Sequence, residues 1–119
     1  MKVEISVDGA RTLDMHEQAL FHAAVVHRNT HAAWRSLDRI HILSQEFGLM
    51  HLASHWRMLR YAWSLRDSRE VLGQLTRLAL APIGNITSKL LFGNTGRANV
   101  STFQPMDIPP DLNAQIARL

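Results

Sequence analysis

The residues best suited to chemistry in this sequence are histidines: there are seven, all between residues 16 and 55, and no cysteine. Without cysteine, a disulfide scaffold, a thiolate metal site and a cysteine nucleophile are excluded. His51 and His55 are four residues apart, so on a helix they share one face and can bind one metal ion. Leu52 stands where the zinc-protease motif carries its general base, which excludes that motif.

Four helices are expected to position these histidines. Two capping boxes predict helix starts, Asp14 with Glu17 and Asp67 with Glu70, and Pro82 predicts the end of the last helix. Gly48 is the expected C-cap of the second helix. The expected ranges are 14–28, 31–47, 49–66 and 67–81.

Short connections make each helix antiparallel to the one before it. The expected fold is therefore all-α, with two stacked antiparallel helical hairpins whose packing resembles that of tetratricopeptide repeats. The chain is predicted to form a single domain over residues 1–119, with an N-terminal arm at 1–13, the four helices at 14–81 and an irregular tail at 82–119 packed on them.

Folding these helices back on each other brings several ligand types to one end. The turn at residues 29–30 places Glu17, or its neighbour His16, level with His41. The turn at Gly48 then places His41 level with His55, with His51 one turn nearer the turn. The sequence thus predicts a metal site of His41, His51 and His55, with Glu17 as a fourth ligand, for zinc, iron, copper or nickel. A three-ligand set leaves one position open to water or substrate.

A second interpretation of these residues stays open. His41 lies on the apolar face of its helix, where a hydrogen-bonded core histidine needs no metal, and Glu17 is also explained by capping. The remaining histidines are expected at the surface or in contacts between helices, without a role in the site. They are His16, His22, His27 and His31.

Composition excludes several classes of function. The net charge of +3 is too small to imply a polyanionic partner. Nucleic-acid binding through Arg35, Arg39, Arg57 and Arg60 is therefore the least supported of the possible functions. No serine lies in a Gly-x-Ser-x-Gly setting. Arginines interrupt every apolar stretch, so no transmembrane segment is expected, and acidic residues near the start argue against a signal peptide. We expect a cytoplasmic protein.

The tail beyond Pro82 carries glycines and prolines. Gly93 and Gly96, with Arg97 beside them, permit a backbone turn whose amides converge on an anion, but the Walker spacing is absent. Turns that fold the tail over the helices are the expected role of this segment, and the tail is expected to cover the histidine end or a groove between the hairpins.

Several segments together resemble a known family. They are Ile40-His41-Ile42-Leu43 with His51 and His55, Arg69–Leu75, Gly93–Gly96, Asn99-Val100-Ser101, Pro105-Met106 and Ile108–Leu112. Over about residues 17–112 the chain is similar to the small bacterial family called domain of unknown function 3703. The Asn29-Thr30 turn departs from the Gly-Asp expected there. The resemblance implies a shared site at the three histidines, but it implies no activity and no particular metal.

Two functions from different classes follow. The first is a small helical metal-binding protein, either catalytic or metal-handling. The alternative is a metal-free helical-hairpin module that binds a protein partner or a second copy of itself. Trp34, Trp56 and Trp63 are the candidates for its surface, although tryptophans at helical spacing are also typical of a core.

Overall fold

The computed structural model describes the backbone of residues 5–86 and 108–119 and the side chains of 5–80 and 108–119. Within these residues the chain is all-helical, which confirms the predicted class. The helices are α1 (Val7–Val26), α2 (Thr30–Ser44), α3 (Gly48–Ser64), α4 (Ser68–Ile86) and α6 (Pro110–Ala117).

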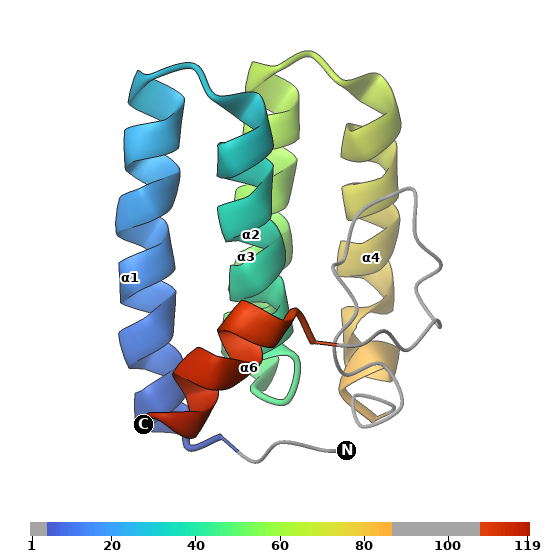
Figure 1. Ribbon diagram of the computed structural model, residues 1–119. Helices are drawn as coiled ribbons and strands as arrows, with labels where there is room; N and C mark the ends of the chain where they lie inside the picture. Colours follow the sequence, from blue (N-terminus) through green and yellow to red (C-terminus); the bar gives the residue numbers. More distant parts are fainter. Residues whose placement is uncertain (1–4, 87–107) are drawn as a thin grey trace.

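The first four helices stand side by side, with α2 at the centre. It packs against α1 and against α3, and α3 packs in turn against α4 (Figure 1). The α1–α2 and α3–α4 turns lie at one end of the molecule, and α6 crosses the opposite end in front of α1 and α2 (Figure 1). The C-terminal half of α2 and the first turns of α3 therefore meet at the end that α6 crosses.

The two turns at the far end are built alike. In the first, Arg28 adopts a left-handed backbone with φ 54°, and the Asn29 amide returns to the Ala24 carbonyl at 2.8 Å. The Asn29 side chain then caps the start of α2 by accepting a backbone amide. Arg66 and Asp67 repeat the same pattern before α4, with φ 56° and an Asp67 cap on the backbone amide three residues later. The predicted Asp67 cap is confirmed.

Other helix boundaries differ from the predictions. Helix α1 begins at Val7, because Ser6 accepts the Gly9 amide and acts as the N-cap, so residues 7–13 are helical rather than an arm. Asp14 lies inside this helix, and its carboxylate accepts from Gln18 and Arg57 instead of capping. Ala10 and Leu13 are buried, so tertiary packing stabilises the two helical turns that precede the predicted start at Asp14.

The predicted helix ends also need correction. Gly48 is the first residue of α3 rather than the C-cap of α2, and α4 continues through Pro82 to its end at Ile86. The predicted irregular tail contains a helix, α6, which starts with Pro110 at its first position, where the missing N–H costs nothing. The predicted glycine turn at Gly93–Gly96 lies outside the described residues.

Two groups of buried apolar side chains hold the helices together. One joins α1, α2 and α3 toward the hairpin turns and is centred on Trp34, Leu37 and Met58. The other lies under α6, where Leu112 and Ile116 pack against side chains of α1 and α2. The group under α6 therefore attaches α6 to α1 and α2.

Arg39 of α2 adds a polar tie at the same place. It is 5% exposed, and its guanidinium donates to Glu17 of α1 at 2.5 Å and to Asp111 and Gln115 of α6 at 2.6 and 2.5 Å. Burial raises the pKa of Asp111, but Arg39 and the other donors around it outweigh this and hold that pKa below its usual range. One buried cation therefore connects three helices.

The left-handed arginines provide a test of the turn geometry. Replacing Arg28 by glycine should raise the free energy of unfolding by about 0.5–1 kcal/mol, because glycine adopts a positive φ without steric cost. Urea unfolding measures the change. As a control, Ala19→Gly at an exposed position inside α1 should lower it by about 1 kcal/mol. Loss of stability in both variants would contradict the assigned turn.

Candidate metal centre

Three imidazole nitrogens converge between α2 and α3. The Nε2 atom of His41 lies 3.1 Å from that of His55 and 3.2 Å from that of His51, and the latter two are 3.1 Å apart. The three ring centroids are 4.6–5.0 Å apart, so the rings meet through their Nε2 atoms. All three side chains are buried, with 3%, 7% and 3% of the surface of residues 41, 51 and 55 exposed.

This triangle has the dimensions of a metal tripod. Zinc–nitrogen bonds of about 2.0–2.1 Å place two nitrogens of a tetrahedral site about 3.3 Å apart. The observed separations of 3.1–3.2 Å are close to that value. These three residues form a group whose ligand atoms could hold one metal ion. A fourth position would remain beyond the face of the triangle.

Helix geometry explains why these three meet. His51 and His55 are one turn apart on the first two turns of α3, so both face the same neighbour. His41 lies in the last turn of α2, on the side that meets α3. The short α2–α3 connection holds the end of one helix against the start of the other, which sets the separation of the imidazoles.

Two side chains of α4 orient one of the ligands. Gln74 donates through its amide nitrogen to the Glu70 carboxylate at 3.2 Å, so the amide oxygen is the atom that faces His55 at 2.8 Å. An oxygen only accepts, so Nδ1 of His55 carries a proton and donates it to Gln74. The neutral tautomer of His55 therefore presents an unprotonated Nε2 to the triangle. A metal-bound histidine is typically oriented by such a partner.

The surroundings also keep His55 neutral. The pKa of His55 is lowered from 6.5 to about 4. Burial is the largest cause; the hydrogen bond to Gln74 opposes it in part, and His51 and Arg77 contribute to the lowering. Arg77 is itself buried on α4, and burial lowers its pKa against the opposing effect of Glu70. A neutral imidazole is the form that binds metal.

The remaining predicted ligand lies elsewhere. Glu17 is not in the group of converging ligands, and its carboxylate is engaged by Arg39 in a buried ion pair. The structure thus brings together three of the four predicted ligands and gives Glu17 a structural contact between α1 and α2. The four histidines that were assigned no role in the site are exposed, as expected: His16, His22, His27 and His31.

Three polar residues of α4 behind the ligands are not among the site residues predicted from the sequence. Glu70, Gln74 and Arg77 are spaced four and three residues apart, so they share one face of α4, and all three are buried. That run of polar residues on a single face was a usable signal. The capping box accounts for Glu70 only in part: its amide is capped by Asp67, whereas its carboxylate accepts from Gln74.

Comparison with known proteins identifies the family. The chain belongs to the family described as protein of unknown function DUF3703, whose sequence profile matches residues 10–116. This range includes all three histidines and the α4 residues behind them. No curated protein and no solved structure is significantly similar to the chain. Among the described residues, no helix is both long and apolar enough to cross a membrane.

The lowered pKa of His55 makes stability depend on pH. As pH falls, the unfolded chain takes up a proton near the ordinary value of 6.5, whereas the folded protein resists until about 4. The metal-free protein should therefore keep its full stability above pH 6.5 and lose up to about 3 kcal/mol between 6.5 and 4. Urea unfolding with a chelator present, at pH 7 and pH 5, measures the loss. His55→Gln should show a smaller loss, and an equal loss would contradict the assignment.

Proposed function

We propose that this protein binds one divalent transition metal ion through the Nε2 atoms of His41, His51 and His55. The convergence of three buried nitrogens within 3.1–3.2 Å is the observation that carries the proposal. Nitrogen ligation suits zinc, iron, copper and nickel, and the lack of cysteine excludes thiolate ligands. The fourth position then belongs to water or a bound molecule.

The electrostatics of the triangle favour a cation at its centre. His55 presents a lone pair, since its proton is on Nδ1, and the other two Nε2 atoms point at the same spot. Lone pairs this close repel one another unless a proton or a metal ion lies between them. A proton on His41 or His51 is the metal-free alternative, and it corresponds to the hydrogen-bonded core interpretation. The two states differ in metal content and in proton release on titration.

The test is a metal titration of protein that has been purified without nickel-affinity chromatography. Wild-type protein is stripped with a chelator and titrated with zinc, followed by calorimetry and by the melting temperature. One ion per chain should bind, and a zinc concentration of 1,000 times Kd should stabilise the fold by about 4 kcal/mol. The His51→Ala, His55→Ala double variant should lose this binding. Its helix content, measured by circular dichroism, shows whether the variant still folds.

Matched control variants distinguish metal binding at the site from effects of the number of histidines and from effects on overall stability. The His27→Ala, His31→Ala double variant removes two exposed histidines and should bind zinc like wild type. Glu17→Gln should lower the melting temperature through Arg39 without changing the stoichiometry. Gln74→Leu keeps all three ligands and should weaken binding about 10–100-fold. Equal metal content in the wild type and the His51, His55 double variant would overturn the proposal.

The fourth position decides between metal handling and catalysis. With cobalt in place of zinc, a tetrahedral site gives strong visible absorption, and added azide changes that spectrum only if a ligand position is exchangeable. An exchangeable position favours a catalytic role, and a closed one favours holding or storing the metal.

A second function, the metal-free interaction module, is favoured by one observation. Trp56 and Trp63 on α3 are 54% and 72% exposed, and they line apolar hollows together with Leu72 and Leu75 of α4. Trp34 is buried and belongs to the core, so it is not part of this surface. The charged side chains of the hollows are arginines, Arg60 and Arg66. This combination fits an amphipathic helix that carries acidic residues.

A synthetic acidic amphipathic peptide tests this second function. Its binding should shift the fluorescence of the exposed tryptophans to shorter wavelength, in the metal-free as well as the metal-loaded protein. Trp56→Ser with Trp63→Ser should abolish binding and change the free energy of unfolding little, since both side chains are largely exposed. A peptide with the same composition in scrambled order should not bind; equal binding by it would contradict the assignment.

Other expectations from the sequence stay predictions. They are the tetratricopeptide-like stacking of two hairpins, the single domain over residues 1–119, the bacterial origin and the cytoplasmic location. Self-association through the Trp56 and Trp63 surface would appear as a concentration-dependent mass in sedimentation. The arginines of that surface would face one another in a symmetric dimer, which argues for a different, acidic partner.

A further inference from the structure

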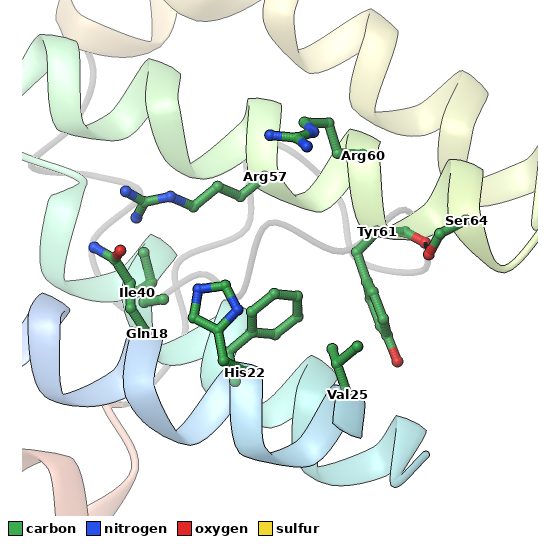
Figure 2. A pocket seen from close by; sticks show the side chains of 9 residues that line it. Gln18, His22, Val25, Ile40, Arg57, Arg60, Tyr61 and Ser64 are labelled. Atoms are coloured by element: carbon green, nitrogen blue, oxygen red, sulfur yellow. Dashed lines mark hydrogen bonds between the residues drawn. The ribbon is translucent and has the colours of Figure 1, made fainter. Parts of the chain in front are cut away.

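A cavity lies between α1 and α3, away from the triangle of His41, His51 and His55. Both helices pack on α2, and the gap between them has a volume of about 380 Å³. That volume falls within the range of about 300–1,000 Å³ typical of small-ligand sites. Side chains of α1 and α3 form the walls, and Ile40 of α2 contributes to the floor. Figure 2 shows this space from close by.

Two contacts cross from α1 to α3 along the cavity. At one end Arg57 of α3 donates to Asp14 of α1 at 3.2 Å. Farther along both helices the Phe21 and Tyr61 rings meet edge to face, with centroids 5.2 Å apart, and Val25 and Ser64 line the cavity beyond them. The cavity is therefore polar toward Arg57, and its apolar side chains lie toward Val25.

The polar end carries the donors suited to an anion. Arg57 reaches back from α3 over Gln18, and His22 points from α1 toward α3 (Figure 2). Arg60 lies on the rim of the same cavity. Two arginines against the single carboxylate of Asp14 leave one positive charge uncompensated, which matches a ligand with one negative charge.

The apolar end suits a flat hydrocarbon body. Phe21 is only partly buried and Val25 is exposed, so both keep apolar surface open to the cavity, and Tyr61 forms the wall opposite. Burying this surface against a ligand removes it from water. The gradient from Arg57 to Val25 would also fix which way round an amphiphilic molecule lies.

We propose that the cavity between α1 and α3 binds a small organic carboxylate with an apolar, flat body, its carboxylate on Arg57 and its body packed against Phe21, Val25 and Tyr61. The bound carboxylate replaces the Asp14 carboxylate as a partner of Arg57. This site is separate from the histidine triangle and does not depend on the metal.

The experiment compares 3-phenylpropanoate with 3-phenylpropanamide, which has the same shape without the charge. Both are titrated into chelator-treated protein at low salt, so that a carboxylate bound to a metal ion cannot account for the result. Backbone amide shifts in NMR spectra report the site and the Kd. The carboxylate should bind at least tenfold more tightly than the amide, with the largest shifts on α1 and α3.

Three variants make the result specific. Arg57→Gln should weaken the carboxylate about tenfold and leave the amide unchanged, whereas Asp14→Asn should tighten the carboxylate because its competitor is removed. Arg69→Gln, at an exposed position on α4, should change neither. Equal affinity for the two probes, no binding of either at millimolar concentration, shifts located away from α1 and α3, or the same Kd in Arg57→Gln would each overturn the proposal.

Discussion

The burial of α2 is the constraint on which the rest of the structure depends. This helix lies between α1 and α3 and is crossed by α6, so that residues 39–44, which cover all faces of its C-terminal half, are buried, including Arg39 and His41. A buried cation or imidazole costs several kcal/mol unless partners replace the lost water. The neighbouring helices therefore have to supply acceptors and donors at defined places along α2.

Two polar sites meet this requirement on two sides of the same helix. Toward α1 and α6, Glu17, Asp111 and Gln115 receive the guanidinium of Arg39. Toward α3, the imidazole of His41 meets those of His51 and His55. The first site needs no further ion, because the carboxylates of Glu17 and Asp111 balance the positive charge of Arg39. The second brings nitrogens together without an anion among them, and this difference is why a metal ion is proposed for the second alone.

Much of the layout could be predicted from the sequence, and the failures have local causes. The hairpin turns and the meeting of His41, His51 and His55 follow from helix periodicity and short connections. The start of α1 was missed because Asp14 also forms a good capping pattern, and only the burial of Ala10 and Leu13 favours the longer helix. The partner of Glu17 was missed because Arg39 and α6 are distant from it in the chain.

The sequence by itself determined which ligand atoms are possible: histidine nitrogens and carboxylates, at spacings that place His51 and His55 on one helix face. Only the tertiary structure decided which of them converge. Glu17 forms an ion pair with the buried Arg39, and Gln74 of α4 sets the tautomer of His55. The physical reason is that periodicity specifies a face within one helix, whereas competition among buried polar groups is settled by every helix that packs around them.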